Sequence, residues 1–162
     1  MSDLPRWLKH TTVWLALALT LFLGLQAWQA RQQATRFVVD GQTLEIRRAG
    51  DGHYHWPGRI GEREVEFLVD TGATGTAIPT ALARELGLQT VGTMQSNTAG
   101  GVVSGQIVVG DVQLRGGVRA ERLRMAALPH LSAPLLGMDV LGRLHWQQEQ
   151  GVLRIVMQGG PK

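Results

Sequence analysis

The longest apolar run lies near the start of the chain, where residues 11–30 contain no charged side chain. About 20 such residues can cross the roughly 30 Å hydrocarbon core of a bilayer as a helix. Trp7 and Trp28 flank the run, and tryptophan favours the two membrane–water interfaces. The pattern predicts a cytoplasmic head at residues 1–10, a single transmembrane helix at residues 11–30 and an exported body.

A cleaved signal peptide is the alternative interpretation of this segment. The apolar part of such a peptide is shorter, roughly 7 to 15 residues, and ends in a small-x-small cleavage site. Trp28 would fill the place of the first small residue if Ala30 were the second. An uncleaved anchor therefore fits better. Two basic residues precede the run and two follow it, so the charge bias favours neither orientation strongly.

Short β patterns begin after a polar spacer. Residues 37–39 and 42–46 lie on either side of Asp40-Gly41, a dipeptide typical of tight hairpin turns. We therefore expect residues 31–52 to form a linker that contains a short hairpin.

A second strand pair is predicted at residues 53–60 and 63–70, around Gly61-Glu62. In the second of these strands Val65, Phe67 and Val69 alternate with glutamates, which is the period of a strand with one buried face. This strand leads directly into Asp70.

One clear helical pattern occupies residues 80–87, with Thr80 as the expected N-cap and Gly87 as the left-handed stop. Residues 92–105 are polar and rich in glycine between β-prone flanks, which indicates a long mobile hairpin. The remaining patterns predict strands at residues 112–114, 117–125 and 152–157, with turns at Gly110-Asp111 and Gln150-Gly151.

Composition supports a mostly β body and excludes several function classes. Glycine supplies 21 of 162 residues, nearly twice the roughly 7% of average usage, which favours short strands joined by tight turns. The chain has no cysteine, so disulfides, thiolate nucleophiles and cysteine-based metal sites are excluded. The excess of three positive charges lies within residues 1–36. The neutral remainder argues against nucleic acid as a partner.

The most informative segment runs from Phe67 to Ala73, where a buried-type strand ends in Asp70, Thr71 and Gly72. A carboxylate at a strand end can be held toward a cleft, and a hydroxyl beside it can hydrogen-bond across a contact. A glycine allows close approach of the backbone. The same residue types are common in ordinary turns, so the motif alone is weak evidence.

Together with the glycine-rich hairpin and Leu135-Leu136-Gly137, this segment resembles the retropepsin-like aspartic proteases, in particular the bacterial membrane-anchored members. The resemblance implies a closed β-barrel with one or two short helices at residues 53–162, and a bacterial inner-membrane location with the body in the periplasm. It implies catalytic roles for Asp70, Thr71 and Gly72. It further implies substrate contacts from Ala73 and a flap at Asn97, Thr98, Ala99, Gly100, Gly101 and Val102, with structural roles near the site for Leu135, Leu136, Gly137 and Asp139.

The chemistry that this resemblance implies requires two carboxylates that share one proton, one acting as general base on a water and the other polarising the scissile carbonyl. The chain contains a single Asp-Thr-Gly. We therefore expect a homodimer that brings two copies of Asp70 together and acts on a peptide or protein substrate, without metal or cofactor. Confinement to the membrane through residues 11–30 would raise the effective concentration of the partners.

Several alternatives remain at this stage. His53 and His55 have the spacing of two metal ligands on one strand face, but no third ligand lies nearby in the sequence. Asp139 is a candidate for a second catalytic acid, although a structural role fits the resemblance better. A catalytically inactive module with the same fold, which binds peptide or only dimerises, is the alternative to the enzyme.

Overall fold

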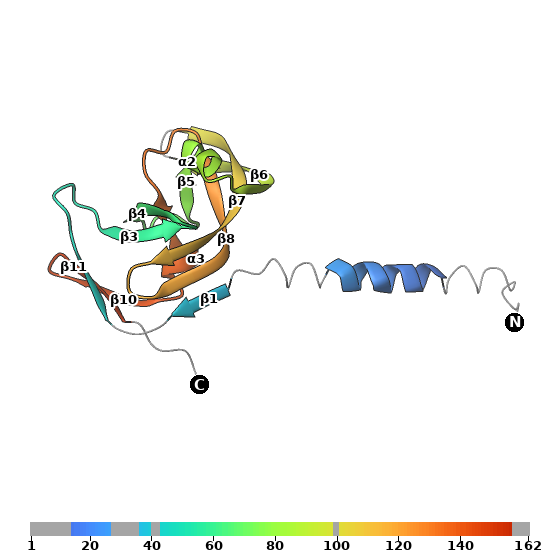
Figure 1. The fold of residues 1–162 in the computed structure, drawn as a ribbon, viewed down its shortest axis with the longest axis horizontal. Helices are drawn as coiled ribbons and strands as arrows, with labels where there is room; N and C mark the ends of the chain where they lie inside the picture. Colours follow the sequence, from blue (N-terminus) through green and yellow to red (C-terminus); the bar gives the residue numbers. More distant parts are fainter. Residues whose placement is uncertain (1–13, 27–35, 40–42, 99–100, 157–162) are drawn as a thin grey trace, which may run out of the picture. The chain divides into compact units, whose positions relative to one another are not determined.

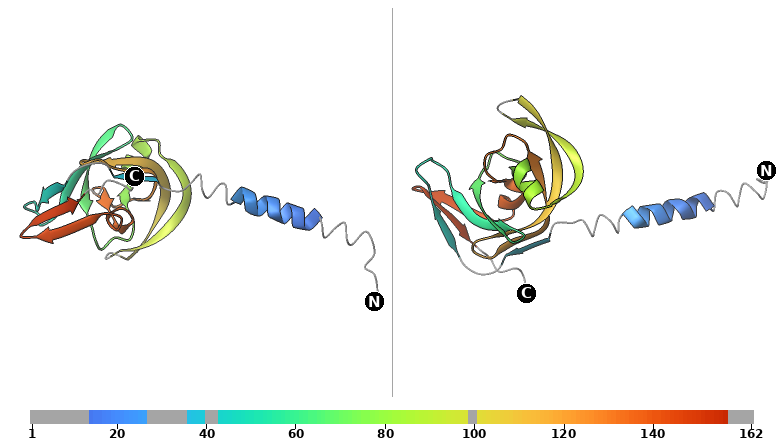
Figure 2. Two further views of the ribbon diagram at one scale, coloured as in Figure 1. Left: turned by 90° about the horizontal axis from the view of Figure 1, so that it is seen from below. Right: turned by 45° about the horizontal axis from the view of Figure 1, so that its top comes forward.

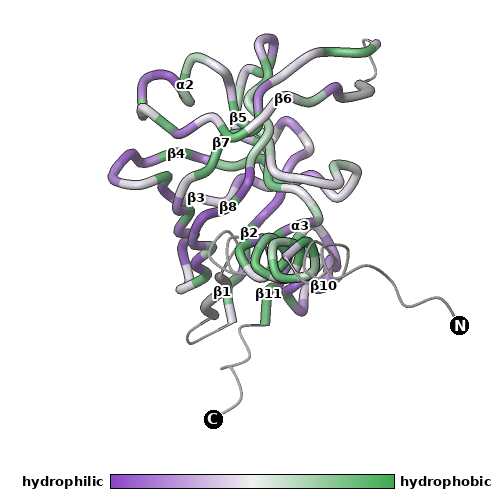
Figure 3. Tube along the Cα trace, turned by 90° about the vertical axis from the view of Figure 1, so that its right-hand side faces the viewer, coloured by the Kyte–Doolittle hydropathy of each residue, from purple (hydrophilic) through white to green (hydrophobic). Residues whose placement is uncertain are grey.

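The fold is that of a computed structural model, which describes residues 14–26, 36–39, 43–98 and 101–156. By its internal contacts the chain divides into two units, Met1–Ala34 and Thr35–Lys162. In the first unit residues 14–26 form a helix of mainly apolar residues, coloured green in Figure 3. Among the described residues, no helix combines the length and the hydropathy needed to cross a bilayer. The head at residues 1–10 and the ends of the expected 11–30 span lie outside the described residues.

Six strands of the second unit close into a barrel (Figure 1). Their order around the barrel is β8, β5, β9, β4, β3 and β7, and the ring closes because β7 also pairs with β8. The bounds of these strands are β3 (His55–Ile60), β4 (Arg63–Val69), β5 (Ala77–Pro79), β7 (Gly101–Leu114), β8 (Val118–Leu128) and β9 (Leu135–Leu136). Two further strands extend the sheet, β1 (Arg36–Val39) beside β8 and β6 (Gln89–Thr98) beside β7.

A separate three-stranded sheet has the order β10 (His145–Glu149), β11 (Val152–Val156) and β2 (Leu44–Arg47). The β6–β7 hairpin reaches away from the barrel at the end opposite this sheet (Figures 1 and 2). Two short helices complete the body, α2 (Thr80–Glu85) and α3 (Met138–Leu141). The prediction of a mostly β closed barrel with short helices is therefore confirmed.

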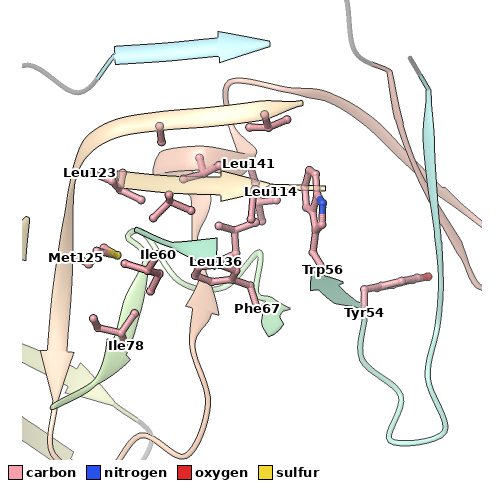
Figure 4. Close-up of a cluster of buried hydrophobic side chains, with 14 of the residues drawn as sticks. Tyr54, Trp56, Ile60, Phe67, Ile78, Leu114, Leu123, Met125, Leu136 and Leu141 are labelled. Atoms are coloured by element: carbon pink, nitrogen blue, oxygen red, sulfur yellow. The ribbon is translucent and has the colours of Figure 1, made fainter. Parts of the chain in front are cut away.

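The core of the barrel is filled by large side chains from strands far apart in the sequence. Trp56 and Ile60 on β3, Phe67 on β4, Ile78 on β5 and Leu136 on β9 are all fully buried (Figure 4). The indole N–H of Trp56 donates to the Arg115 carbonyl oxygen at 2.9 Å, so this buried donor is satisfied. The β4 side chains that face the core are those that the alternation in its sequence predicts. The end of β4 therefore lies against the core.

Tyr54 differs from these residues, because its buried hydroxyl has no hydrogen-bond partner among the described residues. Its ring lies at the edge of the core (Figure 4), and the Arg48 guanidinium carbon is 5.6 Å from the ring centroid. The cation–π contact favours the ring in this place, while the unpaired hydroxyl opposes it.

The strand pair around Gly61-Glu62 is confirmed, with Ile60 opposite Arg63 and a left-handed φ of 56° at Gly61. Gly87 stops α2 with φ 60°, as predicted. Thr80 is not the N-cap, however, because the chain passes from β5 directly into the helix. Pro79 holds the cap position, and no side-chain hydrogen bond caps the helix.

Two predicted turns are wrong. The strands at residues 36–39 and 44–47 form, but they do not pair with each other as a hairpin in the 31–52 linker: β1 pairs with β8 and β2 with β11. Gly110-Asp111 is not a turn either, because β7 continues through it with a shift of register between Gly110 and Val112. A bulge of this kind uses the same residue types as a turn.

Candidate active site

The site is built around the segment from Asp70 to Thr76, which we call the Asp70 loop, between β4 and β5. The strand β9 and the helix α3 hold it from behind. The Asp70 N–H donates to the Leu136 carbonyl oxygen at 3.0 Å, and the Met138 N–H donates to the Ala73 carbonyl oxygen at 2.9 Å. These bonds join two segments more than 60 positions apart, so the position of the loop depends on the whole barrel.

The Asp70 side chain is half-buried, and Thr71 and Gly72 are exposed in the single chain. Asp70 Oδ1 accepts a hydrogen bond from the Gly72 N–H at 2.9 Å. A Cβ atom added at Gly72 would lie 3.2 Å from the same oxygen. Glycine therefore lets this amide approach the carboxylate. The hydrogen bond between them fixes the orientation of the carboxylate at the end of the strand.

A hydrogen-bonded pair of polar side chains, the buried Thr76 and the half-buried Asp139, supports the loop. Thr76 is 1% exposed, and its hydroxyl donates to Asp139 Oδ1 at 2.8 Å and accepts from the Gly137 N–H at 3.3 Å. Asp139 Oδ1 also accepts from the Val140 N–H at 3.0 Å. This carboxylate oxygen is thus engaged by two donors, as expected for a residue that positions the loop.

The backbone of the loop packs closely against Gly137. A Cβ atom at this position would lie 2.5 Å from the Gly75 carbonyl oxygen, closer than any real side chain can approach. Leu135 and Leu136, the residues before this glycine, pair in parallel with Leu68 and Val69 of β4. The segment 135–139 therefore lies directly behind Asp70.

A cavity of about 790 Å³ opens beside the carboxylate. Four of the residues singled out from the sequence line it: Asp70, Gly72, Ala73 and Leu135. Thr71, Leu136, Gly137 and Asp139 are not among its lining residues. The volume lies within the range of roughly 300 to 1,000 Å³ typical of ligand sites.

One side of the cavity is formed by the β6–β7 hairpin. Its strands pair from Gln89 opposite Val109 to Thr98 opposite Gly101, so the connection consists of Ala99 and Gly100, which lie outside the described residues. Asn97 pairs with Val102 next to this connection. Gly101 and Val102 do not line the cavity, and the roles suggested for residues 97–102 stay predictions.

The lining side chains of the hairpin come instead from nearer the barrel, and sequence analysis missed them. They are Met94, Val103 and Ile107. These residues alternate with the exposed polar residues Thr93, Ser104 and Gln106, so the hairpin is amphipathic. The period-two pattern was the signal that could have identified them.

The remaining lining residues missed in the sequence come mainly from β8 and the segment after it. They are Arg124, Met125, Ala126, Leu128, His130 and Leu131. No motif marks these positions, because they reach the cavity only through the pairing of β8 with β5 and β7.

His53 and His55 do not form part of a metal site in the described part of the chain, which contains no group of three potential ligands. His55 Nε2 lies 2.8 Å from Asp51 Oδ2, and its Nδ1 lies 3.5 Å from Glu66 Oε2. The His53 N–H donates to Asp51 Oδ1 at 2.9 Å. This backbone hydrogen bond first, and the His55 side chain second, hold the pKa of Asp51 below its ordinary value of 3.8.

Residues 56–140 match a family model described as aspartyl protease. The matched region includes the Asp70 loop, the β6–β7 hairpin and the segment 135–139 behind the loop. The chain belongs to the aspartyl protease family. Apart from one residue at each end, the match covers the elements that carry the site, from β3 to α3.

The likeness to one solved structure shows that this aspartyl protease has a retropepsin-like fold. It is similar to a retropepsin-like aspartic protease from Rickettsia conorii, with 22% identity and a TM-score of 0.56 over 75% of this chain and 92% of that chain. It is also similar to the simian foamy virus (mac) protease, with 19% identity and a TM-score of 0.43 over 54% and 91% of the two chains. A search of curated proteins found no significant match.

Proposed function

We propose that this protein is a membrane-anchored aspartic endopeptidase that hydrolyses peptide bonds between two Asp70 carboxylates of a homodimer. The observation that carries the proposal is the position of Asp70, at the end of a core strand and on the wall of a cavity large enough for peptide side chains. Membership of the aspartyl protease family supports the same chemistry.

In the proposed reaction the two carboxylates hold one proton between them, because two like charges at such close range cannot both be ionised. The ionised carboxylate takes a proton from a water, whose oxygen adds to the peptide carbonyl carbon. The protonated carboxyl polarises the carbonyl oxygen. Collapse of the tetrahedral intermediate breaks the C–N bond, and the amine leaves with a proton.

The single chain supports the need for a partner. Among the described residues that line the cavity, Asp70 is the only carboxylic acid. Asp139 lies behind the loop with one oxygen engaged by Thr76 and Val140. Thr71 and Gly72 are exposed beside Asp70, so this surface is open to a second copy. A two-fold partner would contribute the missing acid.

The location that we propose is the bacterial inner membrane, with residues 11–30 as the anchor and the catalytic body in the periplasm. The uncharged run of the sequence supports the anchor. Anchoring would favour the dimer, because two chains confined to one surface meet more often than two chains free in solution.

Cleavage of an unfolded protein substrate by the full-length chain in detergent, at acidic pH, tests the chemistry. Asp70→Asn should lower the rate at least about 100-fold, because it removes one acid–base group from each half of the site. Asp111→Asn is the matched control, since Asp111 is exposed and does not line the cavity. Residual activity within tenfold of wild type would contradict the proposal. Peptide binding without cleavage by the wild-type protein would identify an inactive module instead.

Mixing wild-type protein with a tenfold excess of the Asp70→Asn protein tests the shared site. Random exchange of subunits leaves only about one tenth of the wild-type chains in wild-type dimers, so activity should fall in proportion. Thr71→Ala should weaken the dimer in sedimentation experiments if its hydroxyl bonds across the contact. Undiminished activity in the mixture would refute the shared site.

A further inference from the structure

Among the described residues that line the cavity beside Asp70, Arg124 of β8 is the one with a permanent positive charge. Its neighbours Leu123 and Met125 are buried in the core, whereas Arg124 is exposed. Side chains alternate between the two faces of a strand, so Arg124 shares a face with Ala126. Ala126 also lines the cavity. The exposed arginine thus lies on the cavity wall, on the same strand face as Ala126.

Within the part of the chain that the structure describes, Arg124 has no acidic partner of the kind that three other arginines of the body have. These three arginines pair with glutamates: Arg59 with Glu62, Arg63 with Glu85 and Arg154 with Glu45. No ion pair or hydrogen bond of the Arg124 side chain is found within the described residues. Asp70, the only acid on the described cavity wall, forms no ion pair with it. The guanidinium donors are therefore not engaged by any described group of the protein and are available to a ligand of the cavity.

The surroundings of Arg124 would strengthen a contact with a bound carboxylate. Val109 lies opposite it on β7, and Ile107, Met94 and Leu128 supply apolar wall. A peptide that fills such a cavity displaces water, and electrostatic attraction increases as water is removed. Guanidinium is also the side-chain group that best matches the planar geometry of a carboxylate, with two parallel N–H···O bonds.

We propose that Arg124 recognises a carboxylate of the peptide substrate. The enzyme then prefers substrates in which an Asp or Glu side chain lies within a few residues of the cleaved bond, beside apolar side chains that occupy the rest of the cavity. A C-terminal carboxylate has the same chemistry and is the second possible source. This inference rests on the proposed peptidase function and adds a substrate class to it.

The test compares three peptides that differ at one position near the cleaved bond, with Glu, Gln or Lys, in an otherwise apolar sequence. Each is prepared with a free and with an amidated C-terminus. For full-length wild-type protein, kcat/KM for the Glu peptide should exceed that for the Gln peptide by about fivefold or more, and the ratio should fall as salt is added. A higher kcat/KM for the free than for the amidated forms of all three peptides, with a Glu-to-Gln ratio near one, would identify the terminal carboxylate as the ligand.

Variants of two arginines on the same strand separate recognition from general effects of charge. Arg124→Gln should bring the Glu-to-Gln ratio close to one, and Arg124→Glu should shift the preference toward the Lys peptide. Arg119→Gln is the matched control, because Arg119 is exposed on β8 and does not line the cavity. It should leave the ratio unchanged. A wild-type Glu-to-Gln ratio below about twofold together with equal kcat/KM for the free and amidated forms overturns the inference. A carboxylate preference that Arg124→Gln does not alter overturns it as well.

The same peptides also separate this inference from the proposed function. If wild-type protein cleaves none of them, the peptidase proposal fails, and Arg124 is then tested by binding alone. Fluorescence anisotropy with the Asp70→Asn protein should still show tighter binding of the Glu peptide than of the Gln peptide, and Arg124→Gln should abolish the difference. Equal binding would overturn the role of Arg124 independently of catalysis.

Discussion

Replacement of Thr76 by valine tests the support of the Asp70 loop most directly. Valine has nearly the shape of threonine but has no hydroxyl, so the change removes hydrogen bonds without opening a cavity. The threonine hydroxyl bonds both to Asp139 and to the Gly137 N–H, in a position that is 1% exposed. Both partners lie in the segment that holds Asp70 from behind.

The expected loss of stability follows from these two bonds. A hydrogen bond to a charged group contributes about 1.5 to 3 kcal/mol, and a buried N–H left without an acceptor costs about 1 to 3 kcal/mol. The bond from Gly137 is long at 3.3 Å, so we use the lower end, about 1 kcal/mol, for the cost of leaving the Gly137 N–H without an acceptor. Asp139 keeps the Val140 N–H, which limits the penalty on the carboxylate. We expect Thr76→Val to lower the free energy of unfolding by about 2 to 4 kcal/mol.

Urea unfolding of the full-length protein, followed by circular dichroism, measures this loss. Thr76→Ser is the matched control, because serine keeps the hydroxyl and loses only a methyl group, at a cost of about 1 kcal/mol. Hydrogen exchange at the Asp70 N–H, which bonds to Leu136, should accelerate in the valine variant. If Thr76→Val proved as stable as Thr76→Ser, the two hydrogen bonds would not support the loop as argued.

Three further predictions concern other positions. Gly137→Ala should abolish folding or activity in an expression and cleavage assay, because its Cβ would collide with the loop backbone; near-normal yield and activity would contradict this. Tyr54→Phe should leave the free energy of unfolding, measured by thermal denaturation, unchanged or raise it by up to about 1 kcal/mol, since it removes a hydroxyl that has no hydrogen-bond partner among the described residues. Clear destabilisation would indicate that the hydroxyl has a hydrogen-bond partner after all. By NMR titration the pKa of Asp51 should lie below 3.8, chiefly through the His53 amide, and rise partway toward that value in His55→Ala; the stabilisation is present above the unfolded pKa and is lost as pH falls through the folded one. An unchanged midpoint in His55→Ala would exclude the contribution of the imidazole.

Sequence patterns predicted the elements that are stabilised by contacts close in the chain. Val65, Phe67 and Val69 alternate over a strand that pairs with its neighbour in sequence through a tight turn at Gly61. The strands β5 and β9 are only three and two residues long, too short for a period to be detected. They exist because the surrounding barrel pairs with them, which is tertiary context that a local pattern does not contain.

The site was predicted in the same uneven way. Asp70, which lines the cavity, could be singled out as a candidate because its motif is contiguous and its strand is well marked. Other residues of the cavity wall, such as Met94 and Arg124, come from strands that lie 24 and 54 positions further along the chain. Asp40-Gly41 led to the wrong prediction of a hairpin because the turn signal is local. The strands β1 and β2 pair instead with the distant strands β8 and β11.

The dependence of the Asp70 loop on β9 and α3 has a consequence for biosynthesis. The ribosome produces the chain from its N-terminus, so Asp70 is made well before the carbonyl of Leu136 that accepts its amide. Contacts between residues so far apart form late in folding, because closing a long stretch of chain is slow. A nascent chain that ends before residue 135 lacks the support of the loop altogether. The proposed catalytic site therefore assembles only after residues 135–141 have been synthesised, so the ribosome is not exposed to it before that point.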